Sequence, residues 1–237
     1  MEAIVLVGGL GTRLGVLTEK TPKPMLPVGS RPFLEIILDY WEAQGISRFV
    51  LATGYLSKMI QNHFGARFKR AELVYSIEEK PLGTGGALYL AQEKLKSKHP
   101  FLAVNGDTFF EVNLRDLKQF HAAKQAECSI ALFQTLAKDR YEGVEMNEEG
   151  RIQLFLGRLS QEVRHFVSGG VYLMNHGWTK DLVNRRNEKI SVEAEIFPEM
   201  IKQNKHFYGF VSSGRFIDIG IPSDYERAQN FLMKAAG

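Results

Sequence analysis

An arginine and a lysine beside a glycine-rich segment indicate that this chain binds phosphate groups. The segment Gly8-Gly9-Leu10-Gly11-Thr12-Arg13-Leu14 is followed further along by Pro22-Lys23-Pro24. Glycines allow a tight turn in which backbone N–H groups approach a phosphate with no Cβ in the way. Arg13 and Lys23 add fixed positive charge beside this turn. The segment therefore indicates a site for a nucleoside triphosphate.

This glycine segment differs from the two best-known phosphate loops. A dinucleotide fingerprint has a third glycine where Leu14 stands, and it passes directly into a helix. Here Pro22, Pro24 and Pro27 prevent a continuous helix. A Walker loop is excluded because no Gly-Lys-Ser/Thr follows. The alternative is a plain glycine turn with a surface arginine. The prolines around Lys23 disfavour it, because they hold the backbone rigid around one lysine.

Two aspartates follow predicted strands that lie far apart in the sequence. Asp107 comes just after the apolar run 101–104, and Asp218 stands in the same position on the predicted strand 215–219. A carboxylate at the carboxyl end of a strand can hold a divalent cation against phosphates. Mg²⁺ usually takes one or two carboxylates plus phosphate oxygens. We therefore expect both aspartates to converge on one Mg²⁺; the alternative is that each only caps a turn.

The elements that must position these groups alternate along the chain. Strands are predicted at 3–7, 48–53, 72–77, 101–104, 127–135, 166–174, 206–211 and 215–219. Helices are predicted at 33–44, 57–64, 87–91, 114–123, 192–203 and 223–235. Strand–helix alternation at this pitch is typical of parallel strands joined by right-handed crossovers. The polar–apolar alternation at 144–146 and 151–155 predicts an antiparallel ribbon. The fold class is thus α/β, with a Rossmann-like, mostly parallel mixed sheet flanked by helices and a small antiparallel ribbon.

Bulk properties narrow the class of protein. The 237 residues suffice for one sizeable α/β domain, which we expect to span 1–237. A net charge of +3 is too weak to indicate a nucleic acid polymer as partner. The single cysteine, Cys128, cannot form an internal disulfide, which favours the cytoplasm. No apolar run approaches the ~18 residues that span a membrane, and the N-terminus lacks a charged signal segment. We expect a cytoplasmic protein with no membrane partner.

Five segments together resemble the signature of the sugar-1-phosphate nucleotidyltransferases, or NDP-sugar pyrophosphorylases. They follow the family's order over essentially the whole chain: 8–14 with 22–25, 81–86, 105–107, 168–172 and 216–220. The resemblance implies a glycosyltransferase-A-like nucleotidyltransferase fold. It implies that a sugar 1-phosphate and an NTP give an NDP-sugar and pyrophosphate, by Mg²⁺-assisted in-line attack on the α-phosphorus. No covalent enzyme intermediate is needed, and a homodimer is left open.

The resemblance also implies roles for single residues. Arg13, Lys23 and Asp107 are the expected catalytic residues: Arg13 holds the β- and γ-phosphates, Lys23 stabilises charge on the α-phosphate, and Asp107 and Asp218 hold Mg²⁺. The expected nucleotide-binding residues are Leu6, Gly8, Gly9, Gly11, Thr12, Arg13, Glu78, Pro81, Gly83, Thr84 and Asp107. The expected residues on the sugar-phosphate side are Asn105, Tyr141, Arg158, Gly170 and Glu193. For Glu193 the alternative is a solvated carboxylate in the first turn of a helix.

The choice of base rests on separate chemistry. Guanine presents N1–H and the 2-amino group as adjacent donors that one carboxylate can accept as a pair, whereas uracil offers a single N–H between two carbonyls. Glu78 or Glu79 can supply that carboxylate, which favours GTP. The alternative for Glu78 is a hydrogen bond to backbone amides. We expect Gly83 to face the base, because a purine needs close backbone approach.

Within the family, the segments 105–110, 139–141 and 216–222 most resemble the D-glycero-D-manno-heptose 1-phosphate guanylyltransferases. Alternatives are a mannose-1-phosphate guanylyltransferase, a hexose or amino-sugar 1-phosphate uridylyltransferase, or a catalytically silent regulatory subunit that binds nucleotide sugars. A silent subunit has no need for both metal carboxylates together with Arg13 and Lys23. The charged residues therefore favour an enzyme.

Two departures from the family pattern fall at the expected sugar-phosphate subsite. The usual Phe-x-Glu-Lys reads Phe155-Leu156-Gly157-Arg158, so an arginine replaces the lysine that contacts the sugar phosphate. Arg158 can still pair with phosphate, bidentately and with a longer reach. The glycine usual after Arg-Tyr is Glu142 here, followed at once by Gly143.

Overall fold

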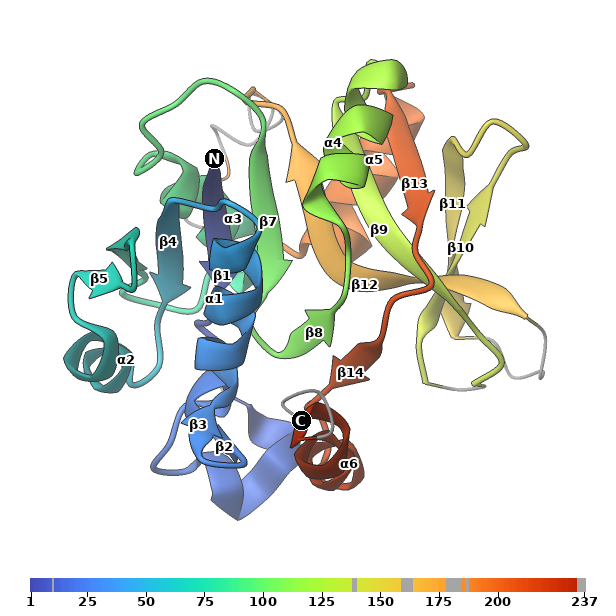
Figure 1. The fold of residues 1–237 in the computed structure, drawn as a ribbon. Helices are drawn as coiled ribbons and strands as arrows, with labels where there is room; N and C mark the ends of the chain where they lie inside the picture. The colour runs from blue at the N-terminus through green and yellow to red at the C-terminus, as the bar shows by residue number, and fades with distance from the viewer. Residues whose placement is uncertain (10, 138–139, 159–163, 178–184, 186–187, 234–237) are drawn as a thin grey trace.

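The computed structural model describes residues 1–9, 11–137, 140–158, 164–177, 185 and 188–233, which form a three-layer α/β fold (Figure 1). The strands are β1 (Glu2–Leu6), β2 (Pro27–Val28), β3 (Arg31–Pro32), β4 (Arg48–Thr53), β5 (Arg67–Phe68), β6 (Ala71–Ile77), β7 (Phe101–Asn105), β8 (Thr108–Phe110), β9 (Cys128–Thr135), β10 (Glu142–Met146), β11 (Ile152–Arg158), β12 (His165–Met174), β13 (Phe207–Val211) and β14 (Phe216–Asp218). The α-helices are α1 (Phe33–Ala43), α2 (Ser57–Phe64), α3 (Gly83–Gln92), α4 (Leu114–Ala123), α5 (Phe197–Lys202) and α6 (Pro222–Met233). In the part of the chain described, no helix is long and apolar enough to cross a membrane.

A ten-stranded mixed sheet carries the fold, in the order β11-β10-β12-β7-β1-β4-β6-β5, with β9 paired to β12 and β13 to β9. β1 pairs in parallel with β4 and β7, and β4 pairs in parallel with β6. β12 runs antiparallel to β7 and β9, and β10 and β11 form an antiparallel ribbon. The predicted α/β class, the parallel core and the ribbon are thus confirmed.

Successive side chains of the central strand β1 point to opposite faces of the sheet and pack into two separate hydrophobic cores. Ala3 and Val5 of β1 pack into one cluster with Leu38 of α1. Ile4 faces the other side and packs with Leu88 of α3. All five side chains are buried. Because β1 is covered on both faces, its end at Leu6 is fixed, just before Gly8 and Gly9.

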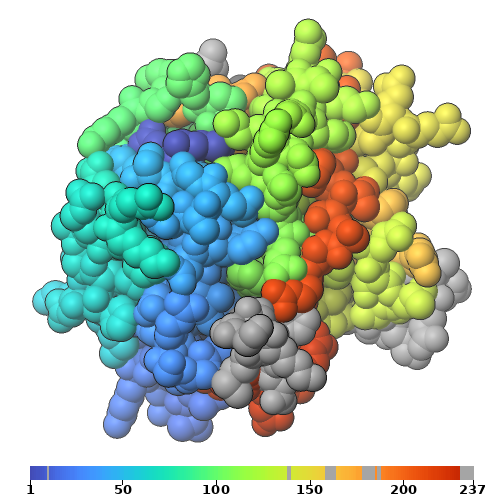
Figure 2. All heavy atoms as spheres, in the orientation of Figure 1, coloured from blue at the N-terminus to red at the C-terminus, as the bar shows by residue number. Residues whose placement is uncertain are grey.

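Three local structures differ from the predicted ones. The segments around the glycines and Lys23 are not plain turns but short 3₁₀ helices, η1 (Thr12–Thr18) and η2 (Lys23–Met25), in which a proline is tolerated in the first turn. The predicted helix 192–203 begins with a π-type turn, η4 (Val192–Ile196), before α5. The last predicted strand lies outside the main sheet, because β14 pairs antiparallel with β8. On the face shown in Figure 2, the β13–β14 segment runs as a band between α4 and the β10–β11 ribbon.

Candidate active site

A cavity of about 340 Å³ lies at the carboxyl ends of β1, β6 and β7. Open parallel sheets bind ligands at this edge. The cavity gathers most of the residues predicted to bind nucleotide and the predicted Asn105. Those predicted residues are Leu6, Gly8, Gly9, Gly11, Thr12, Lys23, Glu78, Pro81, Gly83, Thr84, Asn105 and Asp107. The glycine segment, the Pro-Lys-Pro segment and the end of β7 therefore meet around one space, which we call the nucleotide cavity.

Lys23 and Asp107 form an ion pair at this cavity. Lys23 Nζ donates to Asp107 Oδ2 at 2.8 Å. The lysine side chain is 11% exposed, while the aspartate side chain is 43% exposed. The lysine is therefore held in place by η2 on one side and the carboxylate on the other, and the carboxylate stays open to a ligand.

Asp218 reaches the same place through the β8–β14 pairing. Asp218 lies opposite Thr108 in that ladder, and the Ile219 N–H donates to the Asp107 carbonyl at 3.0 Å. Burial raises the pKa of the Asp218 carboxyl, and the neighbouring Asp107 charge raises it further, while Lys23 acts in the opposite direction. The two aspartates thus share one electrostatic environment, as the sequence predicted. The pairing of β14 with β8, outside the main sheet, brings them together.

The chemistry of these donors suits a divalent cation. Carboxylate oxygens are ligands that Mg²⁺ prefers, and it commonly takes only one or two of them from the protein. Asp218 Oδ1 also accepts the Gly220 N–H at 2.6 Å, which fixes this carboxylate at the strand end. Within the described residues no group of three or more His, Cys, Asp or Glu side chains is placed to hold a metal. Water and phosphate oxygens of a substrate would therefore have to complete any metal site at Asp107 and Asp218.

Arg13 faces a second, adjoining cavity of about 260 Å³. It lines this cavity with Asp218, Glu193 and Tyr141 and does not line the nucleotide cavity. The reason is the turn at Gly11, whose φ of 67° and ψ of 21° redirect the chain into η1. Its predicted contact with the β- and γ-phosphates stays a prediction. We call this space the acceptor cavity, after the prediction that Tyr141 and Glu193, which line it, lie on the sugar-phosphate side.

Glu193 is a wall of the acceptor cavity, so the solvated first-turn alternative is wrong. The Tyr172 hydroxyl donates to Glu193 Oε1 at 2.7 Å. Burial raises the pKa of the Glu193 carboxyl, and the Tyr172 hydrogen bond opposes that rise. The carboxylates of Glu142 and Asp107 raise this pKa further, which places Glu193 among the acids of the site.

Two glycines of the site are required by the protein chain itself. Gly170 has a φ of 71°, and a Cβ there would lie 2.8 Å from Asn105 Nδ2. Gly83 has a φ of 70°, and its Cβ would lie 2.4 Å from the Ile190 carbonyl oxygen. Gly83 lines the nucleotide cavity as expected, but its close approach is to Ile190. The predicted contact of Gly83 with a purine stays a prediction.

Glu78 lies beneath the glycine segment. Its Oε2 accepts the Leu82 N–H at 2.8 Å, so the predicted alternative of a backbone amide is confirmed for this oxygen. Its Oε1 occupies the position where a Cβ on Gly8 would fall, 2.2 Å away. Burial raises the pKa of the Glu78 carboxyl, opposed by the Leu82 bond. Glu79, the other predicted base reader, is exposed and does not line the cavity.

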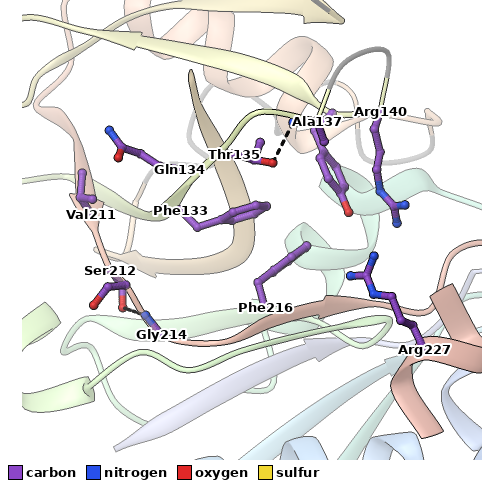
Figure 3. Close-up of a pocket in the computed structure, with 12 residues that line it drawn as sticks. Phe133, Gln134, Thr135, Ala137, Arg140, Val211, Ser212, Gly214, Phe216 and Arg227 are labelled. Atoms are coloured by element: carbon purple, nitrogen blue, oxygen red, sulfur yellow. Dashed lines mark hydrogen bonds between the residues drawn. The ribbon is translucent and has the colours of Figure 1, made fainter. Parts of the chain in front are cut away.

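Tyr141 also borders a third cavity, of about 520 Å³. The Arg140 guanidinium lies 4.8 Å from the centre of the Tyr141 ring and pairs with the buried Asp224. In Figure 3, Arg140 and Arg227 extend toward one another at one side of this cavity, and Val211 lies at the other. Among the described residues, Tyr141 is the sole predicted site residue that lines this space; because it also lines the acceptor cavity, its place on the sugar-phosphate side stays a prediction.

One predicted residue is described only by its backbone, and two residues near the site were not predicted. Arg158 ends β11 opposite Glu142, but its side chain lies outside the described part of the chain, as does Leu10. Sequence reasoning missed Lys189, which lines the nucleotide cavity, and gave no role to Tyr172. The available signals were a lysine just before the predicted helix at 192 and a tyrosine two residues after Gly170.

Comparison with known proteins places these cavities in a family context. The pattern of the family described as "Nucleotidyl transferase" matches residues 2–235. The chain is 40% identical over 232 residues to the D-glycero-alpha-D-manno-heptose 1-phosphate guanylyltransferase of Aneurinibacillus thermoaerophilus, covering 98% of each chain. It is 39% identical to the Campylobacter jejuni enzyme of the same name, covering 95% of this chain and 97% of the relative. The crystal structure of HddC from Yersinia pseudotuberculosis complexed with GMP-PN superposes with a TM-score of 0.83 at 27% identity, covering 98% and 99% of the two chains.

Proposed function

Because this chain belongs to the nucleotidyl transferase family, we propose that it transfers a guanylyl group from GTP to D-glycero-α-D-manno-heptose 1-phosphate, giving the GDP-heptose and pyrophosphate. The family resemblance drawn from the sequence motifs is confirmed by the match over residues 2–235. The observation that carries the specific reaction is the 40% identity over 98% of both chains to an enzyme of that name.

The two adjoining cavities suit two substrates that must meet. The nucleotide cavity binds GTP: the N–H groups of the glycine segment meet its phosphates, and Lys23 neutralises charge that develops on the α-phosphate. The acceptor cavity binds the sugar 1-phosphate, with Glu193 for sugar hydroxyls, and Arg13 reaches from its edge to the β- and γ-phosphates of GTP. A phosphate oxygen of the sugar then attacks the α-phosphorus in line and pyrophosphate leaves on the opposite side. Catalysis rests on positioning and charge neutralisation, so no nucleophilic side chain is required.

Asp107 and Asp218 are proposed to hold a Mg²⁺ ion. When bound, this ion supplies positive charge that draws the phosphate oxygens together and stabilises the leaving pyrophosphate. Lys23 keeps Asp107 oriented through their 2.8 Å ion pair, and the Gly220 N–H keeps Asp218 oriented. The carboxylates must be ionised to do this.

Guanine is favoured as the base for two reasons. The relatives named above are guanylyltransferases, and a half-buried carboxylate, Glu78, lies in the nucleotide cavity. With one oxygen of Glu78 engaged by Leu82, the other accepts from guanine, directly or through a water.

A cytoplasmic location is proposed on the buried, unpaired Cys128. Light scattering tests whether the chain forms the homodimer that the sequence left open.

A matrix of substrates tests the proposal. Each of five NTPs is combined with D-glycero-α-D-manno-heptose 1-phosphate, mannose 1-phosphate and glucose 1-phosphate, with pyrophosphate release as the readout. We expect the highest kcat/KM for GTP with the heptose. A higher kcat/KM for mannose 1-phosphate or for UTP contradicts the assignment in favour of those alternatives. A melting temperature that rises with ligand but no pyrophosphate release indicates a binding subunit.

A further inference from the structure

A row of polar side chains joins the two cavities through the protein interior. The Tyr172 hydroxyl donates to Glu193 Oε1 at 2.7 Å and accepts from Ser168 Oγ at 3.5 Å. Asn105 lies near enough to this hydroxyl to lower the pKa of Tyr172. Asn105 lines the nucleotide cavity, whereas Ser168 and Glu193 line the acceptor cavity. One hydroxyl therefore lies beside side chains from both cavities.

The Tyr172 hydroxyl has little freedom to move. Its residue is 1% exposed and lies in β12 between β7 and β9. The Phe197 ring packs edge-on against the tyrosine ring, with centroids 5.3 Å apart. A buried hydroxyl is costly unless it is hydrogen-bonded, and this one donates a short bond to Glu193 and accepts a longer one from Ser168. Burial and the Glu193 charge raise the pKa of Tyr172 well above its usual value, so it remains a donor.

An irregularity in β12 brings these groups together. Ser168 pairs with Leu132 of β9 and Tyr172 with Ile130, so β12 has two extra residues between these positions. Gly170 takes up the irregularity with its positive φ, and its N–H donates to Ser168 Oγ at 3.3 Å. Such bulges re-aim side chains next to binding sites.

The Glu193 side chain is held less firmly by its own element than the Tyr172 side chain is by β12. It lies in the π-type turn η4, and glutamate has three rotatable bonds that must be fixed before it can accept a specific hydroxyl. The acids Glu142 and Asp107 oppose its ionisation, whereas the Tyr172 hydrogen bond favours the charged form. The tyrosine therefore holds the carboxylate both in place and charged.

We propose that Tyr172 is a positioning residue for the sugar 1-phosphate, whose hydroxyl fixes the Glu193 carboxylate in the acceptor cavity. The inference deepens the proposed function and rests on it in one respect, that the second substrate is a sugar 1-phosphate. Tyr172 itself does not touch the reacting atoms. Its effect passes through Glu193.

The test compares Tyr172→Phe with Tyr75→Phe. Phenylalanine keeps the ring and removes only the hydroxyl. Tyr75 is a matched control because its hydroxyl also donates one short bond, to the Gly65 carbonyl at 2.6 Å, and it lines neither cavity. A hydrogen bond to a charged group typically accounts for a tenfold to hundredfold change in binding, so we expect the KM for the sugar 1-phosphate to rise roughly tenfold or more in Tyr172→Phe. The KM for GTP should change less than about twofold, and Tyr75→Phe should match the wild type.

A double-mutant cycle with Glu193→Ala, which removes the acceptor of the Tyr172 hydrogen bond, separates positioning from structure. If Tyr172 acts through Glu193, Tyr172→Phe adds little to the KM of a Glu193→Ala protein, less than about twofold. Independent, multiplying effects overturn the proposal. So does an unchanged KM for the sugar 1-phosphate, or an equal rise in the KM of both substrates.

Calorimetric titration keeps this test separate from that of the proposed function. If the wild type binds a sugar 1-phosphate but releases no pyrophosphate with it, the proposed reaction fails while the positioning role is still measurable. Tyr172→Phe must then weaken binding of that sugar phosphate roughly tenfold, and an unchanged affinity overturns the inference. If the wild type binds no sugar 1-phosphate, both proposals fail.

Discussion

Replacing Asp107 with asparagine should remove activity while leaving the fold intact. Asparagine has the same shape as aspartate. The substitution removes the negative charge, and it replaces two carboxylate oxygens with one weaker carbonyl acceptor and one NH₂ donor. A side chain that stabilises charge developing in the transition state typically contributes a factor of about 10²–10³ to kcat, and loss of a metal ligand adds to this. We therefore expect pyrophosphate release to fall by at least about 10³-fold.

The expected cost in stability is far smaller. Asp107 is 43% exposed, and exposed ion pairs contribute about 0–1 kcal/mol, although the partner Lys23 is 11% exposed and gives this pair the upper part of that range. Lys23 keeps a second carboxylate nearby, because its charge also acts on Asp218. The free energy of unfolding should therefore fall by about 1 kcal/mol, a shift in Tm of about 2–4 °C. With a typical stability of about 5–15 kcal/mol, the variant remains folded.

Two measurements on the same preparations decide the matter. Mg²⁺-dependent pyrophosphate release gives kcat, and urea unfolding gives the free energy of unfolding. Asp116→Asn, on the exposed face of α4, is the matched control and should leave both unchanged. Near-normal turnover in Asp107→Asn refutes the metal assignment. A fall in stability of several kcal/mol refutes the reasoning about the ion pair.

Three further predictions follow from local geometry. Gly83→Ala should lower the free energy of unfolding by about 1–3 kcal/mol in urea titrations, since its φ of 70° and the Ile190 carbonyl both oppose a Cβ, whereas Gly157→Ala meets open space and should change little. Glu78→Gln should weaken the preference for GTP over other triphosphates. Burial raises the pKa of the Glu78 carboxyl above 4.5 in the folded protein, so the free energy of unfolding of the wild type should fall as pH rises through this folded-state pKa. Unfolding curves of Glu78→Gln, measured from pH 4 to about pH 7, should lack this fall. Burial lowers the pKa of His121 below 6.5, so stability should be lost as pH falls below about 6.5. His121→Gln should reduce that dependence, and His176, whose pKa burial also lowers, accounts for a remaining part. A wild type equally stable on both sides of pH 6.5 contradicts this prediction.

The parallel half of the fold could be predicted because its signals are local. β4 and α4 occupy their predicted residues, since apolar runs and helical spacing lie within each segment. Once strands are known to be parallel, their carboxyl ends must share an edge, which places the glycine segment beside Asp107. The nucleotide cavity was therefore within reach of the sequence.

The acceptor side could not be predicted in the same way. The environment of Glu193 depends on Tyr172, which lies on another element, so its sequence neighbours showed only a helix start. The direction of Arg13 depends on the left-handed conformation at Gly11, a choice that a glycine permits but does not require.

Asp218 shows most clearly why this part of the site escapes pattern reading. Its strand has three residues and pairs with another of three, and such a short ladder has too little periodicity to identify its partner. What fixes the pairing is aromatic packing: Phe216 stacks on Phe133 at 4.1 Å between ring centroids and meets Phe110 edge-on at 5.9 Å. Phe110 belongs to a buried hydrophobic cluster, and Phe133 and Phe216 are half-buried side chains that pack against it. The second carboxylate of the proposed metal site is therefore positioned by hydrophobic contacts, which the sequence displays only as scattered phenylalanines.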